Sequence, residues 1–197
     1  MNSQMAEAML SIKNYDRRRR LQTARHEAGH ALVHILTGIP FLNVEIGRKF
    51  DVDTLLDDKI PGFMEHDGTY SNGVVRSDPL RVIRDLDGRL DPQDVVLISM
   101  SGIAGEQIHY KQPVWRTQDW RWQGGGRFDY EDAKHVVLTR GLCRWRKRHA
   151  YLRSRFFAAW ELLGVHRDEH NALVKALLKR NILSYDGCVS IISEENR

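Results

Sequence analysis

The feature that most constrains this chain is the pattern His-Glu-x-x-His in the stretch Thr23–Thr37, formed by His26, Glu27 and His30. Helical residues four apart lie on one face, so the two imidazoles can aim a nitrogen at one point. Zn²⁺ accepts such a pair at about 2.0–2.1 Å and leaves positions for a third protein ligand and a water. Glu27 can reach that water as a general base. The pattern predicts a zinc site with hydrolytic chemistry.

The surrounding residues favour a helix with one buried face. At roughly 100° per residue, one apolar stripe contains Leu21, Ala24, Ala28, Ala31, Leu32 and Ile35. His26 and His30 lie opposite that stripe, and we expect them to face away from the core. Asp16 is the expected N-cap, Gly38 and Pro40 end the helix near Thr37, and residues 1–15 form a short helix or loose arm.

The rest of the chain favours a predominantly helical α+β fold. We expect one domain over residues 16–197, with the zinc helix and a small sheet in about 16–80 and a helical part in about 81–197. Residues 43–46 alternate like a half-buried strand, and residues 70–76 are expected to form a second strand with a bulge or turn at Asn72-Gly73. Zinc peptidases often hold substrate backbone against a sheet edge. Gly73, Val74 and Val75 are candidates for that edge, although an ordinary core strand fits them somewhat better.

Bulk properties narrow the class of protein. The chain of 197 residues is 42% hydrophobic and 28% charged, as soluble globular proteins are. It contains no apolar run of the ~20 residues that span a bilayer and no signal-peptide core, so we expect a cytoplasmic protein without a membrane partner. Cys143 and Cys188 form no Cys-x-x-Cys pair, and no phosphate-binding loop for ATP occurs.

The positive charge is unevenly distributed. The net charge of +4 reflects basic residues concentrated in Arg17–Arg20 and in Arg140–Arg155, a stretch that also holds Trp145 and Tyr151. Solvated helix faces are the commoner explanation. Contact with nucleic acid is the alternative, although no known reader motif accompanies the basic residues.

An apolar helix is predicted after Asp91. Its run Val95–Ile108 should form the buried spine of the domain, and small residues within it permit close helix approach. Glu106 is the one charge in the run. A buried carboxylate needs a partner, and a metal-ligating histidine is a natural one.

The third zinc ligand is less clear from the residues alone. Asp129 stands at a helix start after the loop Lys111–Arg127, which carries three tryptophans and a glycine triplet. Spacing does not separate a ligand role for Asp129 from an ordinary helix N-cap. The other candidates are Glu106, Glu131, Asp132, His34 and His66.

Together the motifs resemble the peptidase domain of the FtsH family. The segments concerned are His-Glu-Ala-Gly-His-Ala from His26, Ser-Gly-Ile-Ala-Gly-Glu ending at Glu106, and Asp129 four residues before Ala133. The resemblance covers about residues 20–190. It implies zinc bound by His26, His30 and Asp129, with Glu27 as the base and Glu106 supporting the ligands from behind.

Two departures from that family shape the expected function. The family's Asn and Thr are missing around Asp129, and the Arg of the Glu106 element is missing. FtsH proteins also carry membrane helices and an ATP-driven ring, which these residues do not contain. We therefore expect an ATP-independent zinc metallopeptidase acting on peptides or flexible protein segments. The alternative is a catalytically silent binding or adaptor protein. Oligomerisation is compatible with either function.

A second motif competes for metal. His166 to His170 reads His-Arg-Asp-Glu-His, which fits the inverted pattern His-x-x-Glu-His. Its charged neighbours favour an exposed helical turn instead.

Overall fold

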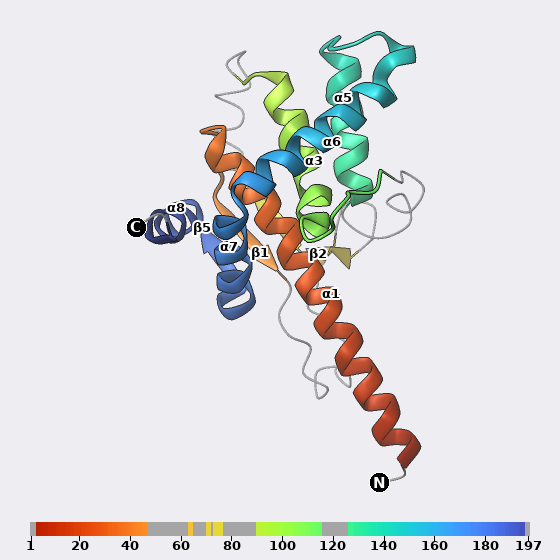
Figure 1. Ribbon diagram of the computed structural model, residues 1–197, viewed down its shortest axis with the longest axis vertical. Coiled ribbons are helices and arrows are strands. Elements are labelled where there is room, and N and C mark those ends of the chain that lie inside the picture. The colour runs from red at the N-terminus through yellow and green to blue at the C-terminus, as the bar shows by residue number, and fades with distance from the viewer. Residues whose placement is uncertain are drawn as a thin grey trace.

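A computed structural model describes residues 3–46, 63–64, 70–71, 73–76, 90–115 and 126–195. Helices dominate and the strands are short, which confirms the predicted α+β class (Figure 1). In chain order the elements are α1 (Ser3–Leu36), β1 (Asn43–Ile46), β2 (Phe63–Met64), β3 (Tyr70–Ser71), β4 (Gly73–Arg76), α3 (Pro92–Gln107), α5 (Gly126–Thr139), the 3₁₀ helix η2 (Trp145–Lys147), α6 (Arg148–Val165), α7 (Arg167–Arg180), β5 (Ile182–Ser184) and α8 (Tyr185–Glu195).

The first helix is longer than predicted. It runs without a break from Ser3 to Leu36, so the expectation that Asp16 begins it is wrong. An N-cap contributes only about 1 kcal/mol, and the preceding segment is rich in alanine, methionine and other good helix formers. The N-terminal half of α1 projects away from the other elements, and the C-terminal half runs through them (Figure 1). The helix ends as predicted, with Gly38 at φ 71°.

The main sheet joins segments far apart in the sequence. Its strand order is β4-β1-β5 and both pairings are antiparallel, with Val44 opposite Val75 on one side and Leu183 on the other. β5 follows α7, so this sheet includes a strand from each of the two predicted parts. β2 and β3 form a separate antiparallel pair. β4 is an edge strand of the main sheet.

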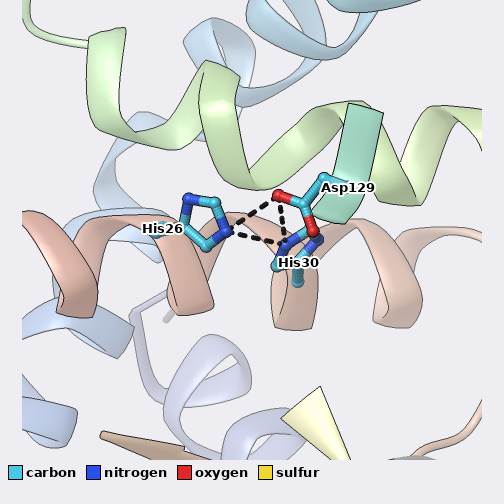
Figure 2. A group of neighbouring side chains, drawn as sticks. All are labelled: His26, His30 and Asp129. Atoms are coloured by element: carbon cyan, nitrogen blue, oxygen red, sulfur yellow. Dashed lines mark hydrogen bonds and ion pairs between the residues drawn. The ribbon is translucent and has the colours of Figure 1, made fainter. Parts of the chain in front are cut away.

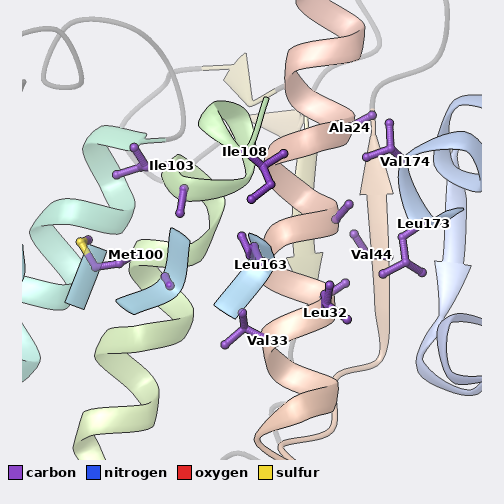
Figure 3. Packing of buried hydrophobic residues seen from close by; sticks show 14 of the residues in the cluster. Ala24, Leu32, Val33, Val44, Met100, Ile103, Ile108, Leu163, Leu173 and Val174 are labelled. Atoms are coloured by element: carbon purple, nitrogen blue, oxygen red, sulfur yellow. The ribbon is translucent and has the colours of Figure 1, made fainter. Parts of the chain in front are cut away.

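The core surrounds the C-terminal half of α1. In Figure 3, residues of α3 and α6 such as Met100, Ile103 and Leu163 lie on one side of the helix, and Val44 of β1 and Leu173 of α7 lie on the other. All five side chains are at most 2% exposed. α1 is therefore a central helix covered on two sides.

The helices α1 and α3 cross in backbone contact. A Cβ on Gly29 would lie 2.4 Å from the Ser101 carbonyl oxygen, and a Cβ on Gly105 would lie 2.5 Å from the Arg25 carbonyl oxygen. Only glycine permits this approach. α3 begins after Asp91 as predicted, and the Asp91 side chain caps it by accepting a hydrogen bond of 2.8 Å from the Gln93 N–H. The crossing brings α3 directly over the His-Glu-x-x-His turn of α1.

None of the described helices combines the length and apolarity that a bilayer crossing requires. Of the predicted loop 111–127, residues 116–125 lie outside the described part of the chain, and α5 begins at Gly126.

Candidate metal centre

His26 and His30 lie inside the protein, contrary to the sequence-based expectation. Their exposed fractions are 5% and 8%. The expectation assumed that one apolar stripe faces one core. In the structure α1 is covered by α3 on the side opposite the stripe as well, because Gly29 and Gly105 let the two helices touch.

Each histidine uses its Nδ1 atom to contact a hydrogen-bond acceptor. His26 Nδ1 lies 2.7 Å from Glu106 Oε1, and His30 Nδ1 lies 2.8 Å from the Ile98 carbonyl oxygen. A carbonyl and an ionised carboxylate can only accept, so both Nδ1 atoms donate. In the neutral ring this leaves the Nε2 lone pair free. Both Nε2 atoms turn toward the same point and lie 3.2 Å apart.

Asp129 reaches this point from α5. The buried face of that helix contains Gly126, Tyr130, Ala133 and Val137, and Asp129 lies one turn before Ala133. Its Oδ2 atom lies 2.9 Å from His26 Nε2 and 3.3 Å from His30 Nε2 (Figure 2). The position in the first turn of α5 also suits a negative charge.

The three converging atoms need a cation between them. Asp129 Oδ2 is buried and has no hydrogen bond of good geometry, although both Nε2 atoms are near. Two lone pairs and a carboxylate oxygen repel one another unless a proton or a metal lies among them. Tetrahedral Zn²⁺ ligands lie about 3.3–3.4 Å apart, close to the observed separations of 2.9–3.3 Å. His26, His30 and Asp129 are therefore a group that could hold a metal ion.

Gly102 of α3 lies directly against the two histidine rings. The point where its Cβ would stand is 2.3 Å from His30 Nε2 and 2.6 Å from His26 Nε2. His26 Cε1 is 2.7 Å from the same point, so the added atom would meet the edge of the His26 ring. A side chain at position 102 would therefore displace both rings from the positions in which their Nε2 atoms converge.

The charges of the site favour a cation. Burial lowers the pKa of His26, but Asp129 and Glu106 outweigh it and raise the pKa well above the ordinary value. Burial lowers the pKa of His30 too, and Asp129 again raises it overall. Burial would raise the pKa of Asp129, but the two rings hold it below its usual range. Without a metal, a proton between His26 and Asp129 meets this demand.

Glu27 follows His26 directly in the chain, and its pKa is shifted. Its exposed fraction is 5%. Burial raises the pKa of Glu27 to about 7, even though the His26 and His30 rings oppose the shift. A metal cation nearby would favour the ionised carboxylate. A buried carboxylate that titrates near neutral pH suits general base chemistry.

None of the other candidates for a third ligand that the structure describes reaches this point. Glu131 pairs with Lys134 on the exposed side of α5, and Asp132 is exposed. His34 directs Nδ1 to the Ile39 carbonyl oxygen at 3.0 Å. His66 lies outside the described residues.

The inverted motif forms no metal site within the described part of the chain. His166 contacts Glu169, while His170 is fully buried and donates from Nε2 to the Arg25 carbonyl oxygen at 3.0 Å. The two rings thus serve different partners. The expectation of an exposed turn fails at His170, which fixes α7 to α1.

The positions of two residues near His26 and His30 were not predicted from the sequence patterns. Gly102 is among the small residues of the predicted spine and belongs to the motif that ends at Glu106, but its place beside the histidines depends on the α3 face that meets α1. Gln22 was not noted at all, although its side chain contacts Glu106. Its position one turn before His26 was the available signal.

Comparisons with models of known protein families and with curated proteins find no match for this chain. The resemblance to the FtsH family therefore rests on the motifs alone, and the site is interpreted from its own geometry.

Proposed function

We propose that this protein is a zinc metallopeptidase that hydrolyses peptide bonds in peptides or flexible protein segments. The observation that supports the proposal best is the convergence of His26 Nε2, His30 Nε2 and Asp129 Oδ2, which lie 2.9–3.3 Å from one another. Glu27, beside the two histidines, completes the set of groups that the reaction requires.

The donor set favours zinc among common metals. Two imidazole nitrogens and one carboxylate match catalytic zinc sites, which keep a fourth position open. Sites for Mg²⁺ and Ca²⁺ are built mainly from oxygen ligands. When bound, Zn²⁺ supplies Lewis acidity that polarises the scissile carbonyl and lowers the pKa of a coordinated water to about 7.

The protein's own residues supply the remaining chemistry. Glu27 accepts a proton from the attacking water and passes it to the leaving amine. Burial raises the pKa of Glu27, which makes it a stronger base than an exposed glutamate. Glu106 and the Ile98 carbonyl hold the two rings in the orientation that directs Nε2 at the site.

A peptide substrate has a natural partner in β4. This strand pairs with β1 on one side, and the described residues place no strand on its other side. We propose that the backbone at Gly73, Val74 and Val75 receives an extended substrate by strand addition. The chain contains no phosphate-binding loop, so hydrolysis is proposed to be independent of ATP, in the cytoplasm.

Glu27→Gln tests the proposal directly. The variant should retain stoichiometric zinc, because Glu27 is not among the metal-holding group, and should lose hydrolysis. The measurement is digestion of a peptide library by the wild type and the variant, with metal analysis of both. Equal cleavage by the two proteins would contradict the mechanism, and absence of zinc in both would favour a silent binding protein.

A second function is favoured by one exposed surface. Arg144, Arg146 and Lys147 are exposed around Trp145, whose own exposed fraction is 62%. The Arg148 guanidinium stacks over the Trp145 ring at 3.5 Å. No acidic residue occurs between Asp132 and Glu161. Cations combined with an exposed aromatic ring are typical of surfaces that bind single-stranded nucleic acid.

This basic surface follows the C-terminal end of α5, which lies about 15 Å along the helix from Asp129. Nucleic acid bound there would leave the metal centre free. Binding should weaken steeply with salt, fall on Arg146→Glu and Lys147→Glu, and be unchanged by Glu27→Gln. Binding that is insensitive to salt and to both charge reversals would exclude this function.

A further inference from the structure

Gln22 ends a chain of hydrogen bonds that leads to the metal-facing nitrogen of His26. Its Nε2 atom donates to Glu106 Oε2 at 2.5 Å. The other oxygen of the same carboxylate, Oε1, accepts from His26 Nδ1 at 2.7 Å. Gln22 and His26 are one turn apart on α1, while Glu106 belongs to α3. The two oxygens of Glu106 thus contact two donors of one helix.

These two contacts fix the orientation of Glu106. Its side chain is 24% exposed, so a carboxylate held only by His26 can rotate toward water. With a donor on each oxygen, rotation breaks both hydrogen bonds. Fixing Oε1 on Nδ1 keeps the proton of His26 on Nδ1 and keeps the Nε2 lone pair directed at the site.

The choice of an amide donor matters chemically. The side chain of glutamine is neutral, so Gln22 holds Glu106 without cancelling its negative charge. A lysine at position 22 would also hold the carboxylate but would neutralise it. His26 would then face a weaker anion and would be a poorer metal ligand.

We propose that Gln22 is a positioning residue of the metal centre, holding the Glu106 carboxylate against His26 so that His26 Nε2 stays available to the metal. The inference rests on the proposed zinc binding by His26, His30 and Asp129. It adds to that function a residue that touches neither metal nor substrate. An ordinary surface hydrogen bond is the simpler explanation, and the two differ in their effect on zinc affinity.

The test is a double-mutant cycle on zinc affinity, measured by competition with a chromophoric chelator. Loss of a group that contacts a metal ligand typically reduces affinity about 10–100-fold, which we expect for Glu106→Leu. Gln22 is one bond further away, so Gln22→Leu should reduce affinity about threefold to tenfold. The double variant should bind no worse than Glu106→Leu, since Gln22 acts only through Glu106.

Thr23→Val is the matched control. Its hydroxyl donates within α1 to the Arg19 carbonyl oxygen at 3.1 Å and does not contact Glu106. The zinc affinity of this variant should equal that of the wild type. Substitutions at exposed positions usually change stability by less than about 0.5 kcal/mol. Because Gln22 is exposed, the fold of Gln22→Leu should be retained.

A second measurement follows the His26 hydrogen bond itself. In zinc-loaded protein with labelled histidine, the Nδ1 proton of His26 should give a slowly exchanging nuclear magnetic resonance signal. Gln22→Leu should accelerate its exchange. The Nδ1 proton of His30, which is bonded to the Ile98 carbonyl, should be unaffected and serves as the internal reference.

The outcomes separate this inference from the proposed function. If Gln22→Leu binds zinc within twofold of the wild type, or if its effect adds fully to that of Glu106→Leu, the positioning role is wrong and the metal centre stands. If the wild type binds no stoichiometric zinc, both proposals fail.

Discussion

Two pairs of buried histidines in this protein have opposite acid–base properties. His26 and His30 have raised pKa values, whereas burial lowers the pKa of His34 and of His170 to about 4. All four residues are at most 8% exposed. The difference is a carboxylate: Asp129 lies beside the first pair, while carbonyl oxygens serve the second. Burial alone makes a histidine a neutral core residue, and the adjacent anion makes it a cation site.

Substitution of the three proposed zinc ligands should have the largest effect of the changes considered. His26→Ala, His30→Ala or Asp129→Ala should lose stoichiometric zinc, because each removes one of the three converging atoms. The expected loss exceeds the about 10–100-fold that loss of an outer partner causes. Metal analysis after gel filtration measures it.

The second pair of histidines provides the control. His34→Asn and His170→Gln each keep a donor near the position of the native N–H, and both should retain full zinc. Full zinc occupancy in Asp129→Ala would remove Asp129 from the ligand set and direct attention to residues outside the described part of the chain.

Substitutions at two glycines of α3 should affect the two pairs of histidines differently. A Cβ on Gly102 meets the side-chain ends of His30 and His26, which can rotate away, so Gly102→Ala should fold and lose zinc. A Cβ on Gly105 meets the Arg25 carbonyl, a backbone atom that cannot move alone, and the His170 ring. Gly105→Ala should therefore lower the free energy of unfolding, by about 1–3 kcal/mol for overpacking.

Urea unfolding and zinc titration distinguish the two variants. Gly102→Ala should show the larger loss of zinc affinity, and Gly105→Ala, measured with a chelator present, the larger loss of stability. If Gly102→Ala instead lost more stability and Gly105→Ala lost more zinc affinity, Gly102 would serve helix packing and would not matter for the zinc-binding positions of the two histidines.

Local signals explain what could be predicted from the sequence. The strand at residues 43–46, the start of α3 after Asp91 and the end of α1 near Gly38 depend on neighbouring residues, and each was found. β5 is only three residues long and exists by pairing with β1, far away in the sequence. No local pattern could reveal it.

The candidate site also has features that local sequence predicts and features that it does not. The spacing of His26 and His30 is a property of one helix, so the pair was predictable. Asp129 was chosen by resemblance, because residue spacing left it equal to a helix cap. Its approach to the histidines depends on how α5 packs on α3. The burial of the pair was missed because it requires the crossing at Gly29 and Gly105, a contact between helices that no periodicity encodes.

Acid should test the neutral character of His170. Its pKa is about 4 in the folded protein and about 6.5 when unfolded, so the unfolded chain binds more protons between these values. The contribution of His170 to stability is full above pH 6.5 and falls as pH decreases toward 4. The total loss is up to about 3 kcal/mol.

His170→Gln removes this titration and leaves the other groups unchanged. With a chelator present, the difference in unfolding free energy between wild type and variant should therefore shrink as pH falls from 6.5 to 4. Denaturant unfolding at several pH values measures it. Parallel curves would show that His170 is not held neutral by burial.

The zinc affinity of the proposed metal centre should change with pH around neutrality, above the range in which His170 titrates. A ligand must lose its proton before it binds zinc, and the pKa of His26 is raised well above its ordinary value by Asp129 and Glu106 against the effect of burial. An ordinary histidine releases its proton near pH 6.5, so zinc affinity would level off above that value. Here the affinity should continue to rise about tenfold per pH unit through neutral pH, because each zinc bound displaces at least one proton from the pair of His26 and Asp129.

Competition with a chelator of known pH dependence measures this slope between pH 6 and 8. His170→Gln should leave it unchanged, since that ring is already neutral in this range. An affinity that is constant above pH 6.5 would mean that the carboxylates do not hold a proton on His26. The two pairs of histidines would then differ in geometry and not in charge. In that case His26, His30 and Asp129 would have to bind zinc through their geometry alone, without the negative charge that distinguishes their surroundings from those of the core histidines.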